Sequence, residues 1–272
     1  MVLGIANPQV LVRDLEMPAL TAAQRAKALP FQARDIVALP IDQVILDFVP
    51  LGAANPETNL VNGLLVATPR QPVLTAVTAV ERAGLKVARV DLSSFAMLRS
   101  IADENLAVEA VIDIGADLTT IVVHNRGVPK LVRTLPRGGR DLTARLVERM
   151  GMAEDLAERV KYDVGLVETG TRADVARTLN DAVRPLLAEI RSSINYFRTG
   201  NDARLERISL TGGGSGLPGL AGVLADQNGV PTNVVTPMQH IRNRWASGEV
   251  SADDDERSAS AVAVGLAMGA AA

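Results

Sequence analysis

Cysteine is absent from the 272-residue sequence, and histidine occurs only twice, as His124 and His240. Without thiols the chain cannot form a disulfide framework, a thiolate zinc site or a cysteine nucleophile. Two histidines are too few for a multi-histidine metal site, so we expect each of them to be structural or solvated. The absence of cysteine is consistent with a reducing compartment, and we expect the protein to be cytoplasmic.

Strong charge of one sign is absent as well, because 28 Lys and Arg stand against 31 Asp and Glu, a formal net charge of -3. Proteins that bind DNA or RNA usually carry an excess of basic residues, so we expect no nucleic-acid partner. Long apolar runs are also missing, and the stretch 259–272 is too short to cross a bilayer. We therefore expect a terminal helix packed against the body of the protein and no direct membrane span.

Aromatic residues are scarce, at one Trp, two Tyr and four Phe, although 47% of all residues are hydrophobic. The core must therefore consist mainly of Ala, Val, Leu and Ile. A chain of this length exceeds one average domain and can bury a sizeable core. We expect an α/β protein with two lobes.

Strand and helix patterns alternate through residues 1–92, which we interpret as a small α/β subdomain. The predicted strands are Val2–Ile5, Gln9–Leu15, Val44–Leu51, Leu64–Thr68 and Val87–Leu92, with a loop from Asn55 to Gly63. A helical pattern over 21–37 contains Pro30, which should kink or split the helix because proline cannot donate to the preceding turn. A second helix starts near Pro72 and ends at Gly84, a residue suited to a left-handed cap.

The rest of the chain also mixes strands and helices. After a helix over Ser94–Ala102, which Ser93 or Ser94 can cap, the predicted strands are Ala110–Ile114, Thr119–His124, Lys130–Leu135, Arg207–Thr211 and Asn233–Val235. Gly138-Gly139 is predicted to open a helix that carries Leu142, Leu146 and Met150. Further helices are predicted through most of 151–206, over Leu217–Gln227 and at the C-terminus. Pro185 should bend the long helix or start a new one. The acidic segment 252–256 is expected to be a solvated loop.

The segment DIGADLTT, residues 113–120, places the carboxylate of Asp113 at a strand end, followed by Gly115 and the hydroxyls of Thr119 and Thr120. Such a carboxylate can hold a water of a Mg²⁺ ion, which prefers oxygen ligands. The amides from Gly115 onward can face phosphate oxygens, because glycine has no Cβ in the way. A purely structural hairpin is the alternative.

Two further features can bind the same kind of ligand. Gly212-Gly213-Gly214-Ser215-Gly216 lies between a strand and a helix, where backbone amides and a helix N-terminus can bind an anion, although a flexible turn explains the glycines equally well. Glu158 and Lys161 lie three residues apart on one helical face. They can contact ribose hydroxyls and an adenine edge, or they can form a surface ion pair.

The order of the motifs DIGADLTT, RGGRDLT, AERVK and LTGGGSGLPGLAGVL resembles the second half of the actin-like ATPase superfamily, which includes actin, heat-shock chaperone ATPase domains, sugar kinases and FtsA. The segments LGIANPQVLVRDLEMP, IDQVILDFVPLG, GLLVATPRQPVLTAVTAVERAGLKVARVDLSSFAMLR, SINYFR and AVAVGLAMG are most similar to the PilM family of type IV pilus assembly proteins. The resemblance covers essentially all 272 residues.

This resemblance implies an actin-like fold of two lobes, with ATP or ADP and Mg²⁺ in the cleft between them. By the family pattern Asp113 would be the catalytic carboxylate that faces the magnesium and the attacking water. The family pattern also assigns Gly115, Thr119 and Thr120 to the terminal phosphates with Gly138 and Gly139 nearby, Glu158 and Lys161 to the ribose and adenine, and Gly212, Gly213 and Gly214 to the α-phosphate and sugar.

The resemblance also implies a division of the chain. Residues 1–92 would be an extra subdomain of the FtsA and PilM type, 93–108 a linking helix of the first lobe, 109–150 and 207–250 the second-lobe nucleotide-binding subdomain, 151–206 a helical small subdomain, and 251–272 an acidic loop and C-terminal helix. The implied partner is the cytoplasmic N-terminal peptide of a PilN-like inner-membrane protein, bound on the extra subdomain. Pilus motor ATPases and the platform protein are implied as further partners, so the protein would be recruited to the inner face of the cytoplasmic membrane.

One departure from the superfamily pattern concerns catalysis. Superfamily members begin with a strand-turn-strand that carries an Asp-x-Gly phosphate motif, and none precedes Val2 here. We therefore expect a first lobe without its N-terminal strands. ATP hydrolysis should be weak or absent, since phosphoryl transfer requires the charge to be enclosed from several sides. The alternatives are an FtsA-like cell-division protein and an ATP-dependent kinase of the same superfamily.

Overall fold

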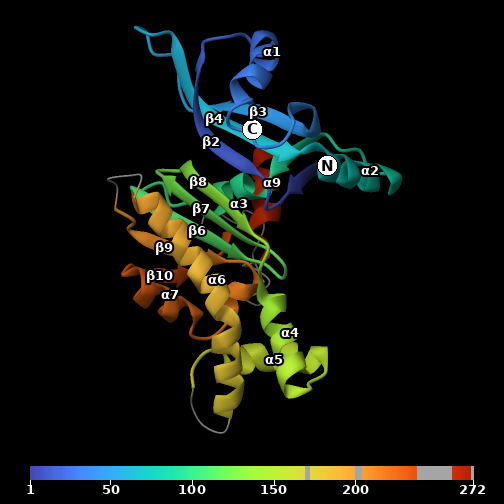
Figure 1. Ribbon diagram of the computed structural model, residues 1–272, viewed down its shortest axis with the longest axis vertical. Coiled ribbons are helices and arrows are strands. Elements are labelled where there is room, and N and C mark those ends of the chain that lie inside the picture. The colour runs from blue at the N-terminus through green and yellow to red at the C-terminus, as the bar shows by residue number, and fades with distance from the viewer. Residues whose placement is uncertain (169–171, 200–203, 238–258, 271–272) are drawn as a thin grey trace, which may run out of the picture.

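The computed structural model describes residues 1–168, 172–199, 204–237 and 259–270. The molecule is elongated: a small three-stranded unit lies at one end, a five-stranded sheet lies in the middle, and a group of helices forms the other end (Figure 1). His240 and the acidic segment 252–256 lie outside the described residues, so the predictions made for them stay predictions.

The central sheet is mixed and has the strand order β10-β9-β6-β7-β8. Its strands are β6 (Val108–Ile114), β7 (Thr119–Asn125), β8 (Val128–Leu135), β9 (Arg207–Thr211) and β10 (Thr232–Val234). Strands β6, β7 and β8 pair antiparallel, whereas β9 runs parallel to both β6 and β10. All five strands were predicted from the sequence, and each of their ends lies within two residues of its predicted position. Positive φ angles at Arg126 and Gly127 allow the tight turn between β7 and β8.

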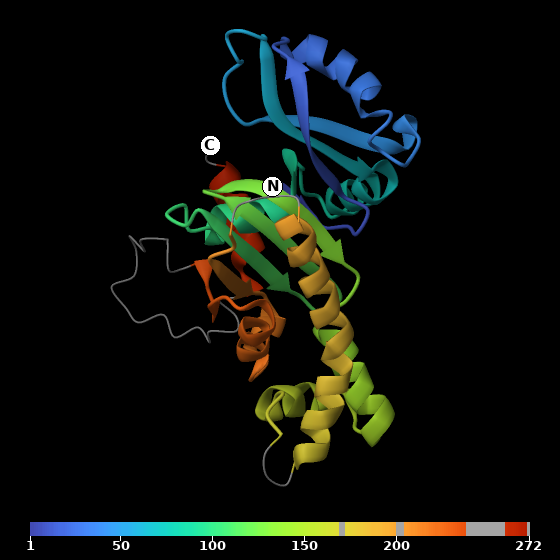
Figure 2. The same ribbon diagram turned by 60° about the vertical axis from the view of Figure 1, so that its left-hand side comes forward.

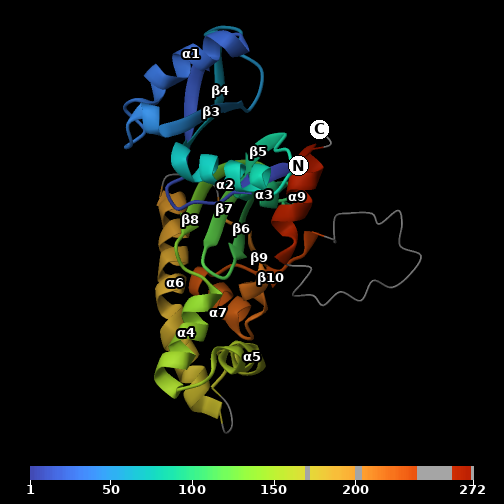
Figure 3. The same ribbon diagram turned by 90° about the vertical axis from the view of Figure 1, so that its right-hand side faces the viewer.

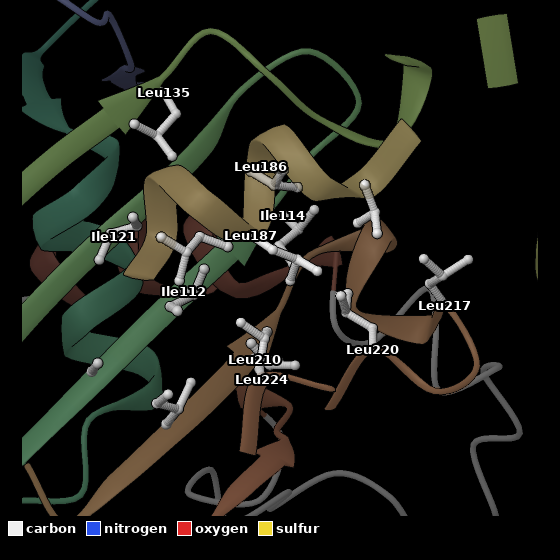
Figure 4. Close-up of a cluster of buried hydrophobic side chains, with 14 of the residues drawn as sticks. Ile112, Ile114, Ile121, Leu135, Leu186, Leu187, Leu210, Leu217, Leu220 and Leu224 are labelled. Atoms are coloured by element: carbon white, nitrogen blue, oxygen red, sulfur yellow. The ribbon is translucent and has the colours of Figure 1, made fainter. Parts of the chain in front are cut away.

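Side chains alternate between the two faces of the central sheet, and both faces are covered. On one face Ile112, Ile114 and Ile121 pack against Leu186 and Leu187 of α6 (Ala173–Thr199), as Figure 4 shows. Helix α6 continues without a break through Pro185, so the prediction that this proline starts a new helix is wrong. Burying each large aliphatic side chain contributes roughly 1.5–3 kcal/mol, which explains why one apolar stripe holds a helix of this length.

On the opposite face Val111, Val122 and Val132 pack against α3 (Ser93–Ile101). Helix α9 (Ala261–Ala270) lies beside α3, and the two-stranded parallel sheet of β1 (Val2–Ile5) and β5 (Arg89–Leu92) lies next to them (Figure 3). The two ends of the chain therefore meet in one layer. The predicted cap at Ser93 or Ser94 is wrong, because α3 has Leu92 as its N-cap residue and no side-chain cap.

The three-stranded unit has the antiparallel order β2-β4-β3, as Figure 2 shows above the central sheet. It consists of β2 (Leu11–Pro18), α1 (Ala22–Ala33), a 3-10 turn (Ile41–Gln43), β3 (Val44–Pro50), β4 (Leu60–Pro69) and α2 (Arg70–Arg82). Strands β1 and β5, at the two ends of the range 1–92, do not join this sheet but pair with each other.

Two details of the three-stranded unit differ from the sequence predictions. Helix α1 begins with a capping box between Thr21 and Gln24 and continues through Pro30 to Ala33, so Pro30 does not split it. Strand β4 starts at Leu60, so Gly63 belongs to the strand and not to a loop. A Cβ at Gly63 would lie 2.3 Å from the ring of Phe48, which explains the glycine inside a strand.

Candidate functional site

A cleft of about 340 Å³ opens at one end of the central sheet. It lies where the turn between β6 and β7 meets α4 (Gly139–Met150), α5 (Glu154–Val164) and the glycine-rich turn after β9. That turn forms a short 3-10 helix (Gly213–Gly216) and leads into α7 (Leu220–Asn228). The lining residues are Gly115, Ala116, Gly139, Arg140, Thr143, Glu154, Asp155, Glu158, Lys161, Tyr162, Gly213 and Gly214.

The structure brings together six of the predicted site residues as cleft lining. These are Gly115, Gly139, Glu158, Lys161, Gly213 and Gly214. The other five, Asp113, Thr119, Thr120, Gly138 and Gly212, do not line the cleft but belong to the strands and turns that form its wall. The separate motifs of the sequence therefore converge, although not every predicted residue reaches the open space.

Asp113 lies near the end of β6, opposite Thr120 on β7 and Thr211 on β9. Burial raises the pKa of the Asp113 carboxyl to about 6, because desolvation disfavours the charged form. Gly212 covers this carboxyl: a Cβ at Gly212 would lie 2.1 Å from the Asp113 Oδ1, and its φ of +82° also favours glycine. The carboxylate of Asp113 is partly buried, and a hydrated Mg²⁺ beside it would stabilise the ionised form.

The hydroxyl of Thr119 is used within the protein. It is fully buried and donates a hydrogen bond of 2.9 Å to the carbonyl of Arg137, just before α4. Thr120 is also buried and pairs with Asp113 across the strands. In this structure Thr119 therefore fixes the loop that leads into α4, and it does not offer its proton to the cleft.

The glycines at the start of α4 allow two turns to approach closely. A Cβ at Gly138 would lie 2.3 Å from the Ala116 carbonyl oxygen. The Gly139 amide donates to the Gly115 carbonyl over 2.9 Å, and the Gly115 amide donates to the Leu118 carbonyl over 2.9 Å. In this structure the amides of Gly115 and Gly139 are therefore both satisfied within the protein.

Glu158 and Lys161 form the predicted ion pair, with 2.8 Å between the Lys161 Nζ and the nearer carboxylate oxygen. The surface-pair interpretation is wrong for the lysine, whose side chain is 3% exposed, while that of Glu158 is 49% exposed. Partial burial acts to raise the pKa of Glu158, but the hydrogen bonds from Lys161 and Thr143 outweigh it and lower that pKa. Glu158 thus presents an ionised carboxylate to the cleft.

Sequence reasoning missed several residues of the cleft. Thr143 hydrogen-bonds to Glu158 and Lys161, and Tyr162 donates its hydroxyl proton to the Gly213 carbonyl over 3.1 Å. Arg140 lines the mouth and pairs with the exposed Asp117 at 2.6 Å. Thr143 and Arg140 lie within the motif RGGRDLT, and Tyr162 follows Lys161 directly, so proximity to the quoted motifs was the available signal.

A second hollow, of about 580 Å³, lies between the three-stranded unit and the central sheet. Its lining residues are Pro8, Gln9, Val10, Leu11, Arg13, Ile36, Val37, Ala38, Leu39, Val44, Ala67, Thr68, Leu131, Val132, Arg133, Thr134, Ser193 and Tyr196. No motif in the sequence indicated it, because its walls come from five separate segments of the chain, within 8–13, 36–44, 67–68, 131–134 and 193–196.

The mixed sheet covered by helices on both faces, with a cleft between glycine-rich turns at its end, is that of an actin-like ATPase fold. MreB5 of Spiroplasma citri bound to ADP matches it with a TM-score of 0.51 at 14% identity, over 74% of this chain and 64% of that chain. The family model of the type IV pilus assembly protein PilM matches residues 1–271, so the chain belongs to the PilM family of type IV pilus assembly proteins.

Two further comparisons agree with this family. The PilM-PilN type IV pilus biogenesis complex matches with a TM-score of 0.81 at 28% identity, over 98% of this chain and 78% of that chain. The cell division protein FtsA of Bacillus subtilis is 29% identical over 150 residues, which are 49% of this chain and 34% of that protein. The chain thus spans about a third of that relative's length. Within the described ranges no helix is both long and apolar enough to cross a bilayer.

Proposed function

We propose that this member of the PilM family is a scaffold that holds the cytoplasmic N-terminal peptide of a PilN-like inner-membrane protein in the second hollow, which we call the peptide groove. Recruitment to the inner face of the cytoplasmic membrane would follow from that contact. Pilus motor ATPases and the platform protein are proposed as further partners. The observation that carries the proposal is Thr68, whose hydroxyl is buried in the groove wall without a hydrogen-bond partner in the described part of the chain.

Thr68 is 8% exposed, and it lies near the end of β4 where that strand faces the groove. An unsatisfied buried hydroxyl costs about 1–3 kcal/mol, so such groups usually have a partner in the functional state. A backbone group of a bound peptide would supply that partner.

The edges of two sheets border the peptide groove. Strand β2 is an edge of the three-stranded sheet, and β8 is an edge of the central sheet, so within the described residues each has only one strand neighbour. Edge strands carry unpaired N–H and C=O groups and can accept an extended peptide as an added strand. The groove therefore suits a short extended segment better than a helix or a compact molecule.

The chemistry of the groove walls indicates the kind of peptide. Most lining residues are apolar, and the charged ones, Arg13 and Arg133, are both basic. An extended peptide with apolar side chains and an acidic residue would complement them. The guanidinium of Arg133 is held by a hydrogen bond to the hydroxyl of Ser193 over 3.3 Å, which orients it without neutralising its charge.

Titration of a fluorescent synthetic N-terminal peptide of a PilN-like protein tests the proposal. We expect one site per chain, with affinity reduced about tenfold by Thr68→Val, since one hydrogen bond of about 1.4 kcal/mol is lost. Arg133→Glu should weaken binding further by reversing a charge. Arg82→Glu, on α2 and outside the groove lining, is the matched control and should leave affinity unchanged. A folded Thr68→Val variant that binds as tightly as the unaltered chain would contradict the assignment.

The cleft at the end of the central sheet is proposed to bind ATP or ADP with Mg²⁺. Residues of three elements would hold it: Gly213 and Gly214 beneath the sugar and α-phosphate, Glu158 at the ribose, and Asp113 behind the magnesium and its water. A Cβ at Gly213 would meet no atom within 4 Å, so this glycine borders open space that a ligand can fill. The Mg²⁺ that accompanies a bound nucleotide would supply the positive charge that stabilises an ionised Asp113.

A further inference from the structure

The outer face of α6, which runs from the group of helices to the central sheet (Figure 1), carries arginines at intervals of seven residues. They are Arg177, Arg184, Arg191 and Arg198, and we call them the arginine stripe. Seven residues make almost two full helical turns, so the four side chains lie on one side of the helix, roughly 10 Å apart along its axis. The first three are exposed and Arg198 is half-buried. Charge of one sign therefore follows most of the length of this helix.

The protein itself neutralises little of this charge. Arg184 lies 3.3 Å from the carboxylate of Asp181, which also pairs with Arg149 of α4 at 3.3 Å. Arg191 has no ion pair or hydrogen bond within the described residues. The positions three and four residues to either side of it, where an acidic partner on the same helix would lie, hold uncharged side chains: Leu187, Ala188, Ile194 and Asn195.

The two arginines at the ends of the stripe are bonded to neutral groups. The Arg177 Nε donates to the carbonyl of Ala173 over 3.3 Å, one turn earlier in α6. Arg198 donates to the carbonyl of Asn228, at the end of α7, over 2.9 Å. These bonds orient the guanidinium groups and leave their charge uncompensated. The stripe therefore remains positive as a whole.

Two further hollows lie along the stripe. One, of about 460 Å³, lies where the end of α4 meets the start of α6, and its lining includes Arg177 and Arg184. The other, of about 430 Å³, lies between α6 and Gln227 of α7, and its lining includes Arg184 and Arg191. Arg184 lines both hollows, so they adjoin. Ala188, between these two arginines, lets another backbone approach the helix closely.

The seven-residue period indicates the shape of the partner. Two helices that wind around each other keep residues of this period in contact along their whole length. An extended peptide repeats every two residues and would not match the spacing. A membrane surface is disfavoured, because the exposed side chains between the arginines are small or polar and would not enter its apolar layer. These side chains are Ala188, Ser192 and Asn195.

We propose that the arginine stripe is a docking surface for an acidic α-helix of a partner protein, whose Asp or Glu side chains recur every seven residues. Guanidinium groups bind carboxylates through paired hydrogen bonds, and a row of such pairs contributes more than one isolated surface pair. The stripe is separate from the peptide groove, which α6 borders through Ser193 and Tyr196. The proposal therefore depends on neither ligand proposed above.

Two synthetic helical peptides of identical composition, each with four Glu residues in an Ala-rich sequence, test the proposal by fluorescence anisotropy. In the first peptide the glutamates recur every seven residues, and in the second they are distributed around the helix. We expect the first to bind about tenfold more tightly and to weaken as salt is added. Equal affinity for the two peptides, or no binding of the first at millimolar concentration, would overturn the proposal.

Charge reversals locate the contact. Arg184→Glu and Arg191→Glu should each weaken binding of the first peptide about tenfold. Arg145→Glu, on the exposed side of α4, is the matched control and should leave the affinity unchanged. All three positions are exposed, and circular dichroism verifies that the variants fold. Unchanged affinity in folded Arg184→Glu and Arg191→Glu variants would contradict the assignment.

Phosphatidylglycerol vesicles distinguish a partner helix from a lipid surface. We expect Arg191→Glu to leave the weak retention of the chain on such vesicles unchanged, because the stripe has no apolar side chains to insert. Strong retention that Arg191→Glu abolishes, together with no preference between the two peptides, would assign the stripe to lipid headgroups and overturn the proposal.

Discussion

At the scale of single residues, one charged side chain with many hydrogen bonds lies outside the lining of the cleft and of the peptide groove. Glu109 on β6 is fully buried and accepts hydrogen bonds from His124 on β7, Ser209 and Arg207 on β9, and the backbone amide of Asp103. These donors come from both strands that flank β6 and from the linker that follows α3. Glu109 therefore joins three strands at the place where the chain enters the central sheet.

The bonds around His124 define its protonation. The Gly127 amide donates to the Nδ1 over 3.0 Å, so the single proton of a neutral ring sits on Nε2 and is donated to Glu109 over 2.9 Å. The expectation of a structural His124 is thus confirmed. Burial acts to raise the pKa of Glu109, but the bonds from His124, Ser209, Asp103 and Arg207 outweigh it and hold this pKa at about 2.

Replacing Glu109 should therefore have a large and pH-dependent effect. Glu109→Gln leaves Arg207 without its buried partner, and we expect a loss of about 3 kcal/mol in the free energy of unfolding at pH 7, measured with urea. Because the pKa of the folded state lies below the ordinary value, the stabilisation is complete above pH 4.5 and disappears as the pH falls toward 2. The difference between the two proteins should therefore shrink over that range.

A surface carboxylate provides the control for this prediction. Glu148 pairs with Arg145 on the exposed side of α4, and such pairs contribute little. Glu148→Gln should change the free energy of unfolding by less than about 0.5 kcal/mol at any pH. Equal small effects of both substitutions would show that Glu109 does not hold the strands together.

At the scale of elements, the contact between α3 and α9 depends on one small residue. A Cβ at Gly265 would lie 1.7 Å from the carbonyl oxygen of Ala96, so the two helices approach as closely as their backbones allow. The Ser100 hydroxyl also donates to the Ala261 carbonyl over 2.8 Å. The end of the chain is thus fixed to the helix that covers the central sheet.

We predict that Gly265→Ala destabilises the protein by about 2 kcal/mol, because the added methyl group forces backbone apart in a packed layer. Gly222→Ala in α7 is the matched control: its Cβ meets nothing within 4 Å, and alanine should stabilise that helix by roughly 0.5–1 kcal/mol. Thermal unfolding measures both. A Gly265→Ala variant that unfolds at or above the temperature of the unaltered chain would contradict the close contact.

Most elements could be predicted because their patterns are local. In β6, Ala110, Ile112 and Ile114 face one side of the sheet and Val111 faces the other, so an uninterrupted apolar run specifies a strand that is buried on both faces. In α6 the apolar residues form one stripe, which specifies a long helix. The errors at Pro30 and Pro185 have a common cause: tertiary packing of the flanking residues outweighs the lost backbone hydrogen bond. That packing partner is distant in sequence and leaves no local signal.

At the scale of the whole molecule, the candidate sites differ in how far the sequence revealed them. The cleft at the end of the central sheet was predicted in outline, since glycines at strand ends mark close backbone approach, and nucleotide binding there stays a proposal. The surroundings of the individual residues in the cleft were not predicted. Lys161 was expected either to form a surface ion pair or to contact a ligand, but its ammonium group is enclosed by Gly139, Thr143 and Glu158. The peptide groove was missed because the buried hydroxyl of Thr68 and the edge strands β2 and β8 come together only in three dimensions.

The central claim is that an extended PilN-like peptide joins the strand edges that border the groove, and amide hydrogen exchange with and without the peptide tests it most directly. We predict slower exchange in residues 8–13 and 128–135 when the peptide is bound, because edge amides gain hydrogen-bond acceptors, with α2 and α5 unchanged. Thr68→Val should reduce that protection at a fixed peptide concentration. Bound peptide that protects only residues outside the groove, or none at all, would contradict the account.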